Sequence, residues 1–160
     1  MKQIALLFVL LLGVMFTAFW LEKKGVKLSG QLGEGYKHEL KVGEKIIKVE
    51  IADTDLKLKR GLSGREKIED DEGMLFVVPE NSIPSFWMKD MKFPIDIIWI
   101  DDLKVVGILE NLPVPSETES ELPRYQPKYP IDYVLEVKAG FAKDNNIKIG
   151  DEVELPKEIK

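Results

Sequence analysis

Apolar and polar side chains alternate along parts of the chain, and this alternation predicts strands. The clearest case is IIKVEIA at 46–52, where Lys48 and Glu50 share one face and Ile47, Val49 and Ile51 share the other. A period of two is typical of a strand with one solvated face. Further strands are predicted where apolar residues fill a strand's length: a short one at 36–42, then 74–78, 85–89, 95–100, 103–111 and 133–139.

Two short helices interrupt the strand pattern. The first is predicted at 54–60, with Asp53 as its N-cap, basic residues in its last turn and Gly61 as its C-terminal cap. The second is predicted at 141–145, and 147–155 should follow it as a turn and a closing strand. Between the strands at 95–100 and 103–111, Asp101 and Asp102 form a link of the right length for a two-residue hairpin.

Many strands and few helices indicate a mainly β fold. We expect an antiparallel β-sandwich or jelly-roll-like barrel with one or two short helices at its edges. The segment 112–130 contains five prolines, and proline cannot donate the hydrogen bonds of a central strand. It is therefore predicted to be a long surface loop, and loops of this length are either functional lids or excursions without structure of their own.

The N-terminal segment has a different pattern from the rest of the chain. Residues 4–21 carry no charge and are flanked by Lys2 on one side and Lys23 and Lys24 on the other. Eighteen helical residues span about 27 Å, close to the roughly 30 Å of a hydrocarbon core. No small-x-small cleavage pattern follows the apolar stretch, so a single transmembrane signal-anchor is favoured over a cleaved signal peptide.

The predicted anchor divides the chain into three parts. Residues 1–24 would be the membrane anchor, 25–44 a glycine-rich tether and 45–157 the β domain. Basic residues on the two sides of the anchor nearly balance, but the very short N-terminal tail favours a globular domain outside the cytoplasm. We therefore expect a single-pass membrane protein whose β domain faces the cell envelope.

Composition and charge exclude several kinds of function. Cysteine is absent from the 160 residues, which removes disulfides, thiol nucleophiles and zinc–thiolate sites. Beyond residue 24 the chain has 20 basic and 27 acidic residues, so a nucleic acid would be a poor partner. The single histidine, His38, has no second nitrogen or sulfur ligand, and the acidic run at 69–72 lacks the spacing of a calcium loop. We expect no metal and no cofactor.

Three charged residues interrupt predicted apolar strand faces. Asp96 shares a face with Ile98 and Ile100, Glu136 shares one with Val134, and Lys89 shares one with Trp87. A carboxylate in such a row needs hydrogen bonds or a cation.

Two interpretations of these charges are open. They could form one polar pocket with Arg60 and Arg65, in which Asp96 and Glu136 perform acid–base chemistry. Alternatively, Arg60 or Arg65 pairs with a partly buried carboxylate and fixes the first helix and its loop against the sheet.

A cluster of aromatic and methionine side chains lies between two of the predicted strands. It comprises Phe86, Trp87, Met88, Met91 and Phe93. These side chains would ordinarily belong to the core. If some of them are exposed, they would form an apolar platform suited to a sugar, which stacks on aromatic rings, or to a protein partner.

Four separate motifs resemble one known family, domain-of-unknown-function family 192, also called uncharacterised protein family 0127. The resemblance covers 46 to about 155 and rests on Arg60, Gly61, Leu62 and Arg65; on 73–76; on 86–89; on Pro94, Asp96 and Asp101; and on Leu135, Glu136 and Gly140. It implies a mostly antiparallel, jelly-roll-like fold, often with an N-terminal signal or anchor, and no established reaction. The family's pattern has Asn-Thr after the lysine, where this chain has Asp90 and Met91.

Two functions of different class follow from these observations. The first is a membrane-anchored binding or accessory module that takes an envelope protein or glycan as its ligand and acts through the rim from Lys89 to Asp96 and the loop at 112–130. Its candidate ligand-binding residues are Arg60, Arg65, Trp87, Met88, Lys89, Asp96 and Glu136. The second is an envelope hydrolase that uses Asp96 and Glu136 as its acid–base pair. The first is favoured because motifs for a nucleophile, a metal or a cofactor are missing.

Overall fold

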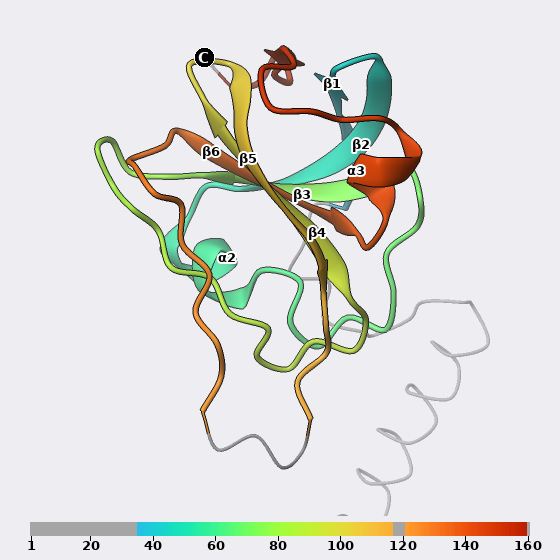
Figure 1. Ribbon diagram of the computed structural model, residues 1–160, viewed down its shortest axis with the longest axis vertical. Coiled ribbons are helices and arrows are strands. Elements are labelled where there is room, and N and C mark those ends of the chain that lie inside the picture. Colours follow the sequence, from blue (N-terminus) through green and yellow to red (C-terminus); the bar gives the residue numbers. More distant parts are fainter. Residues whose placement is uncertain (1–34, 117–120, 160) are drawn as a thin grey trace, which may run out of the picture. The chain divides into compact units, whose positions relative to one another are not determined.

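The computed structural model describes residues 35–116 and 121–159, which form one curled, seven-stranded mixed sheet with two short helices (Figure 1). The strands are β1 (His38–Val42), β2 (Lys45–Ala52), β3 (Glu72–Val77), β4 (Ile95–Asp101), β5 (Lys104–Leu112), β6 (Tyr133–Lys138) and β7 (Val153–Glu154). The helices are α2 (Asp55–Arg60) and α3 (Phe141–Asp144). The strand order is β5-β4-β6-β3-β2-β1-β7. β1 lies within the segment predicted as tether, where a short strand was expected.

The sheet is mixed, so the prediction of a purely antiparallel fold is wrong. β2 and β3 run parallel, with Glu50 opposite Met74, while the other neighbouring strands run antiparallel. Parallel strands need a crossover connection, which is supplied here by α2 and residues 61–71. This crossover places α2 against one face of the sheet.

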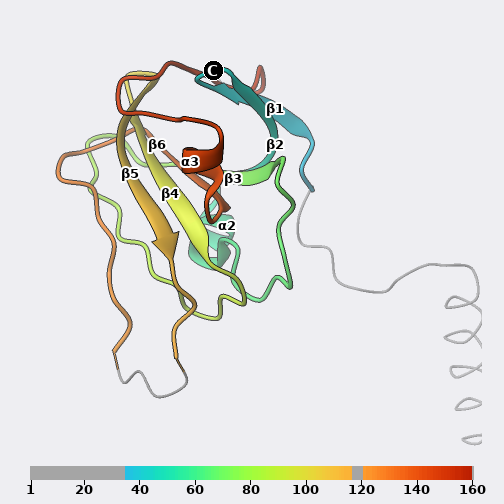
Figure 2. The same ribbon diagram turned by 45° about the vertical axis from the view of Figure 1, so that its right-hand side comes forward.

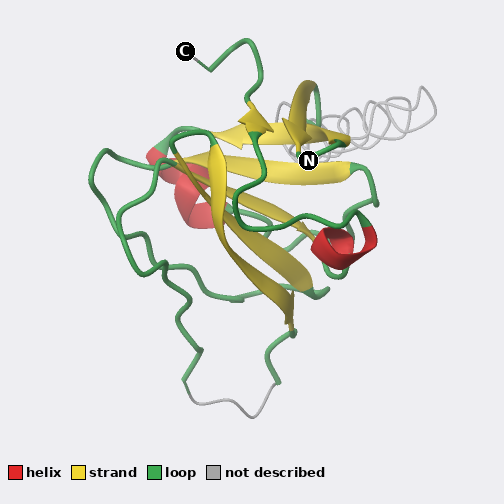
Figure 3. Cartoon of the chain, turned by 45° about the horizontal axis from the view of Figure 1, so that its top comes forward, coloured by secondary structure: helices red, strands yellow, loops and turns green. Residues whose placement is uncertain are grey.

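The sheet also curls instead of forming the two layers of a sandwich. β7 pairs with β1 at one end of the strand order, and Glu152, just before β7, forms a bridge with Lys104 at the start of β5, the other end. The backbone N–H of Val105 donates to the carbonyl of Asp151 at 2.9 Å. The two ends of the sheet therefore meet at one corner, and the fold is a half-barrel instead of a sandwich or jelly roll (Figure 3).

Each face of the sheet has its own apolar core, and a helix lies on each face (Figure 2). The α3-side core consists of Leu40, Val42, Ile47, Val49, Leu75, Ile98, Ile100, Val105, Leu135, Val137, Phe141, Ala142, Ile147 and Val153. The α2-side core consists of Ala52, Leu62, Ile68, Met74, Phe76, Val78, Met88, Met91, Ile95, Ile97, Trp99, Leu112, Ile131 and Val134. β4 pairs with β5 and β6 and is buried on both faces, so its prediction as a central strand is confirmed.

Local capping explains the bounds of α2. The side chain of Thr54, not that of Asp53 as predicted, accepts a hydrogen bond from the backbone N–H of Lys57 at 3.4 Å. Gly61 ends the helix as predicted, with a φ of 51°, a conformation that other residues adopt only with strain.

The hairpin between β4 and β5 is shifted by one residue from its predicted position. Asp102 and Leu103 have φ values of 46° and 55°, and Asp101 pairs with Lys104. Two successive positive φ angles are the mark of a type I′ hairpin turn, and such a turn suits the twist of the flanking strands. The two turn residues are therefore Asp102 and Leu103, not Asp101 and Asp102.

The predicted strand at 85–89 is wrong. Only Phe86 pairs in strand fashion, through an isolated bridge to Tyr125, with N···O distances of 2.9 and 3.0 Å. Pro84 precedes this stretch, and Asp90 after it has a φ of 56°, so the backbone turns before a ladder can extend. Phe86 and Met88 instead pack onto the α2-side core as part of a loop.

The predicted anchor, residues 4–21, lies outside the described residues. Within 35–116 and 121–159, no helix is long and apolar enough to cross a membrane.

Candidate functional site

Asp96 and Glu136 lie on neighbouring strands but on opposite faces of the sheet. In the β4–β6 pairing, Asp96 is opposite Val137, and Glu136 is opposite Ile97. Directly paired residues share a face, and successive residues alternate between faces. The Asp96 side chain therefore points to the α3-side core and Glu136 to the α2-side core, so the two carboxyl groups cannot act together on one bound substrate.

The Asp96 carboxylate is enclosed by backbone donors. Its two oxygens accept hydrogen bonds from the backbone N–H groups of Asn111 at 2.8 Å, Gly140 at 3.1 Å and Ala142 at 3.0 Å. The side chain is fully buried. Two of these donors belong to the start of α3 and the third to a bulge near the end of β5. Asp96 thus fastens α3 and the end of β5 to β4, which is a structural role.

Glu136 lies in a pocket of about 500 Å³ on the other face. The pocket is lined by residues of α2, β3 and the loops that follow them, with one residue from the loop after β5 and one from β6: Leu58, Lys59, Arg60, Gly61, Leu62, Ser63, Phe76, Val78, Pro79, Pro84, Ser85, Phe86, Trp87, Met91, Arg124 and Glu136. Most of this lining is apolar or aromatic. Such a pocket with a few polar groups is the usual form of a small-molecule site.

Two local features create the pocket. Gly61 lets the end of α2 approach the sheet closely, because a Cβ atom there would lie 3.3 Å from Phe76 and 3.8 Å from a carboxyl oxygen of Glu136. On another wall, Phe76 and Phe86 meet edge to face with ring centroids 5.1 Å apart. The 86–125 bridge holds Phe86 in this position.

Within the described residues, Glu136 forms no hydrogen bond and no ion pair, and 5% of the residue is exposed. No described side-chain oxygen is both sealed from solvent and without a partner, so solvent in the pocket reaches the Glu136 carboxyl group. Burial raises the pKa of its carboxyl group to about 8, and the positive charge of Arg65 offsets part of that rise. Desolvation disfavours the charged form of an acid. At neutral pH, Glu136 is therefore an uncharged carboxylic acid that can both donate and accept hydrogen bonds.

Cationic side chains line the pocket together with Trp87. Lys59, Arg60 and Arg124 are part of its lining. The Arg124 guanidinium lies 3.9 Å from the centre of the Trp87 ring, and the Lys89 ammonium lies 5.6 Å from the same ring. Both arrangements are cation–π contacts. Trp87 is 39% exposed, so it is accessible to a ligand.

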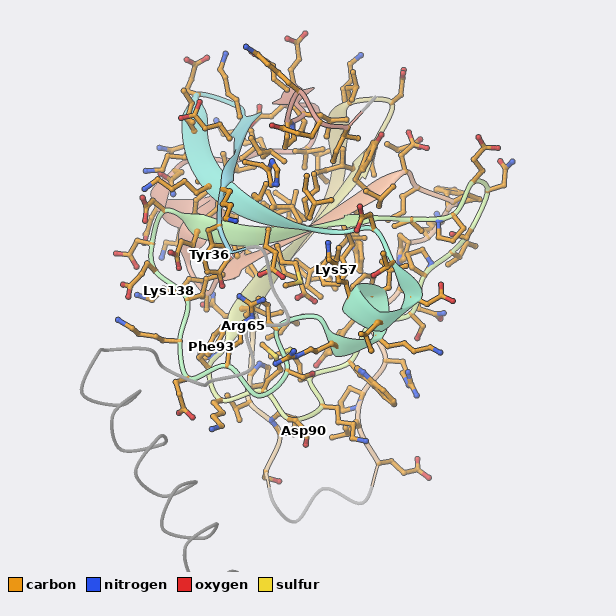
Figure 4. All side chains as sticks on the ribbon, turned by 180° about the vertical axis from the view of Figure 1, so that it is seen from behind. Tyr36, Lys57, Arg65, Asp90, Phe93 and Lys138 are labelled. Atoms are coloured by element: carbon orange, nitrogen blue, oxygen red, sulfur yellow. The ribbon has the colours of Figure 1, made fainter. Side chains whose placement is uncertain are left out.

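Arg65 forms a structural clamp instead of lining the pocket. Its guanidinium donates to the Glu50 carboxylate at 2.6 Å and to the Tyr36 hydroxyl at 2.7 Å, and Figure 4 shows Tyr36 and Arg65 side by side. Glu50 is 3% exposed, so its prediction on a solvated face is wrong. The structure thus agrees with the interpretation in which an arginine pairs with a buried carboxylate, and Arg65 has that role.

The remaining predicted site residues separate into three environments. Arg60 and Trp87 line the pocket. Met88 is 2% exposed and belongs to the α2-side core. Lys89 lies near Trp87 but not in the lining, and its carbonyl oxygen accepts a hydrogen bond from the Ser63 hydroxyl at 2.7 Å. The aromatic and methionine cluster is therefore divided between core and pocket.

Sequence reasoning missed Phe76 and Arg124 as site residues. Phe76 belongs to a strand predicted only as core, and Arg124 lies in the proline-rich loop. The described parts of that loop leave the end of β5 and return beside Phe86 (Figure 1). No three described His, Asp or Glu side chains are grouped closely enough to hold a metal ion.

The fold and site define a class of protein: a half-barrel β domain with an aromatic-lined pocket, into which opens a carboxyl group that pairs with no described residue. Residues 38–155 match the model of the family described as DUF192, Uncharacterized ACR. The chain belongs to this family.

Two solved structures are similar to the chain. One is a candidate transcription regulator from Sinorhizobium meliloti 1021, with a TM-score of 0.67 and 29% identity over 75% of this chain and 95% of that one. The other is a protein of unknown function from Novosphingobium aromaticivorans DSM 12444, with a TM-score of 0.64 and 29% identity over 72% of this chain and 83% of that one. No curated protein matches the chain significantly.

Proposed function

We propose that this protein is a binding module that holds a small ligand, or the end group of a larger one, in the pocket around Glu136. The observation that carries the proposal is a carboxyl group that is almost fully buried yet has no partner within the described residues. Because no described side-chain oxygen is both sealed from solvent and unpartnered, the Glu136 carboxyl group opens to the pocket that it lines. A ligand in the pocket would therefore meet a polar group that no other part of the described chain satisfies, and it could supply the hydrogen-bond partner.

The shape of the site supports binding more than catalysis. A hydrolase of the expected type needs two carboxyl groups about 5 to 9 Å apart on either side of one bond. Asp96 faces away from the pocket and already accepts three hydrogen bonds, so Glu136 has no second carboxylate from β4 to work with. The geometry therefore does not support a hydrolase that uses Asp96 and Glu136 as its acid–base pair.

The proposed place of action is the cell envelope. An uncharged segment at residues 4–21 would anchor the chain in a membrane and leave the β domain outside the cytoplasm. The partner expected there is an envelope protein or glycan, and its end group would enter the pocket. These parts of the proposal rest on the sequence.

The three tryptophan side chains allow a direct test on the full chain, reconstituted in phosphatidylcholine nanodiscs. Trp87 lines the pocket, Trp99 lies in the core, and Trp20 belongs to the predicted anchor. Fragments with one apolar and one polar end are screened by NMR of the ¹⁵N-labelled indole groups. We expect hits that shift the Trp87 resonance and leave that of Trp20 in place.

Two matched variants locate the binding site. Ser85 is exposed and lines the pocket, so Ser85→Trp should fill it and abolish the shifts. Ile149 is 69% exposed and does not belong to the lining, so Ile149→Trp should leave the shifts unchanged. Hits that bind the Ser85→Trp variant as well as wild type, or a broad screen without hits at Trp87, would refute the proposal.

A further inference from the structure

We propose that the ligand of this pocket is an amphipathic organic anion: an anionic group held by Lys59, Arg60 and Arg124, and an apolar or aromatic body whose far end lies against Glu136. The inference rests on the proposed binding function and adds the chemical class of the ligand. Three observations lead to it.

The first observation is the state of the three cations. Lys59, Arg60 and Arg124 form no ion pair with any described residue, although eight ion pairs occur elsewhere in the described chain. Beyond residue 24 the chain has an excess of seven acidic residues, so this grouping of unpaired positive charge runs against its average. Charges beyond about 8 Å are largely screened at physiological salt, so these nearby cations determine which ligands the pocket favours.

The second observation is the apolar interior. Phe76, Phe86, Trp87 and Met91 contribute side chains to the pocket. Their burial of a ligand's hydrocarbon surface would contribute roughly 25 cal/mol per Å². A volume of about 500 Å³ is within the range of small-molecule sites, roughly 300 to 1,000 Å³. An inorganic anion would leave this interior unfilled, so the ligand needs an organic body.

The third observation is the charge of Glu136, the pocket residue against which the far end of the ligand would lie. An ionised carboxylate there would repel an anion, but Glu136 keeps its proton up to a pKa of about 8 because burial disfavours its charged form. In that state it can donate a hydrogen bond to an acceptor at the far end of the ligand.

The main competing ligand is an ammonium ion, which would ionise Glu136 and pair with it. The two classes predict opposite pH dependence. Affinity for an anion falls as pH rises above 8, because Glu136 loses its proton. Affinity for an ammonium ion rises up to the same pH, because the proton no longer has to be displaced. Lysine and arginine side chains stay charged over this range.

The test uses three probes of similar shape, each with a methoxy oxygen at its far end as the hydrogen-bond acceptor: 3-(4-methoxyphenyl)propanoate, 3-(4-methoxyphenyl)propanol and 3-(4-methoxyphenyl)propylamine. Each is titrated into the full chain in phosphatidylcholine nanodiscs, and the Trp87 indole shift gives the affinity at pH 6.5 and pH 9. We expect the propanoate to bind about tenfold more tightly than the alcohol, since charge-assisted hydrogen bonds are the stronger ones. Its affinity should fall about tenfold between the two pH values.

Variants show which residues cause the preference for the propanoate and which cause the pH dependence of its affinity. Arg124→Gln should remove most of the preference for the propanoate and leave binding of the alcohol nearly intact. Lys128→Gln removes an equal charge from the same loop at a residue outside the pocket lining, and the preference should persist. Glu136→Gln should abolish the pH dependence while still binding the propanoate, because the amide remains an uncharged donor.

Each other outcome overturns the inference. Equal affinity for the three probes would show that the cations do not select the ligand. The proposed binding function would then depend on the result of the fragment screen alone. Tightest binding of the amine, with an affinity that rises with pH, would assign the site to cations. If no probe shifts Trp87 while the screen yields hits, the ligand class is wrong and the proposed function is not.

Discussion

Asp96 and Glu136 are two buried carboxyl groups on paired strands, one residue out of register, and they differ in what surrounds them. Asp96 faces the α3-side core and accepts three backbone hydrogen bonds. Glu136 faces the α2-side core, opens to the pocket and has no hydrogen-bond or ion-pair partner within the described residues. Burial alone therefore does not distinguish a structural acid from a functional one. Partner groups do, because a fold optimised only for stability would satisfy or remove a carboxyl group at this depth.

The same contrast applies to the two faces as a whole. On the α3 side, the buried acid is closed in by α3 and the end of β5, so its carboxylate is not exposed to a ligand. On the α2 side, the crossover between β2 and β3 and the returning proline-rich loop stand away from the sheet and leave the pocket. Mutations should separate the faces clearly: changes on the α3 side lower stability, whereas changes in the pocket alter binding.

The largest effect is expected for Asp96→Ala. It leaves three backbone N–H groups without an acceptor, and each buried unsatisfied donor costs about 1 to 3 kcal/mol. We predict that the free energy of unfolding, measured by urea titration of the full chain, falls by about 4 to 5 kcal/mol. Asp55→Ala is a suitable control, because Asp55 is exposed at the start of α2, and it should cost less than about 1 kcal/mol. A loss as small as the control's would show that Asp96 does not hold α3.

The next largest effect is expected when Glu50, a buried acid on the α2 side, loses its partner Arg65. Arg65→Met leaves the Glu50 carboxylate buried without its cation, and breaking such a pair costs about 3 to 5 kcal/mol. We predict a loss of about 3 to 4 kcal/mol of unfolding free energy in the same assay. The double variant Glu50→Met with Arg65→Met should regain most of that loss, because no unpaired charge remains. Stability equal to wild type in the single variant would contradict the clamp.

Local sequence patterns predicted which side chains of the same strand share a face with each buried acid. Alternation correctly grouped Asp96 with Ile98 and Ile100, and Glu136 with Val134, because side-chain direction within a strand depends only on the period of two. What alternation could not predict was the register between β4 and β6, which places the two acids on opposite faces. Register depends on pairing between residues about 40 positions apart, and no local pattern encodes it.

Two other differences between the predicted and the observed fold also arise from pairing between residues far apart in the sequence. The parallel pairing of β2 with β3 depends on how residues 61–71 cross the sheet, whereas the strands themselves were predicted correctly. At 85–89 the composition favoured a strand, but only Phe86 finds a partner, in a loop far along the chain. The position of Arg124 over Trp87 follows from that long-range bridge, so no local signal marks Arg124 as a site residue.

The third prediction concerns how the unsatisfied acid depends on pH. The folded state holds the Glu136 proton up to a pKa of about 8, whereas the unfolded chain loses it near the ordinary value of 4.5. Between these values the folded state binds more protons, so wild-type stability falls as pH rises. The slope is roughly 1.4 kcal/mol per pH unit. Glu136→Gln does not titrate, so its advantage over wild type should grow by about 2 to 3 kcal/mol between pH 5 and pH 7.

Urea titrations of both chains at several pH values measure this difference, which should level off above pH 8, where both states have lost the proton. Asp96 offers the contrast, since Asp96→Asn should lower stability at each of these pH values. A difference between wild type and Glu136→Gln that does not change with pH would show that Glu136 is solvated or paired in solution.

The smallest effect on stability is expected for Trp87→Ala, and this variant separates binding from folding most sharply. Trp87 is 39% exposed, and its ring has cation–π contacts with Arg124 and Lys89; such a contact contributes about 0.5 to 1 kcal/mol at an exposed site. The neighbouring Met88 is 2% exposed, and Met88→Ala should cost about 2 to 5 kcal/mol. If the pocket binds a ligand, Trp87→Ala should weaken binding about tenfold, measured by calorimetry with the fragment hits, while Met88→Ala binds normally wherever it is folded. The reverse pattern, in which Trp87→Ala lowers stability and Met88→Ala weakens binding, would show that the ligand binds outside this pocket. The exposed residue would then support the fold, and the buried residue would contact the ligand.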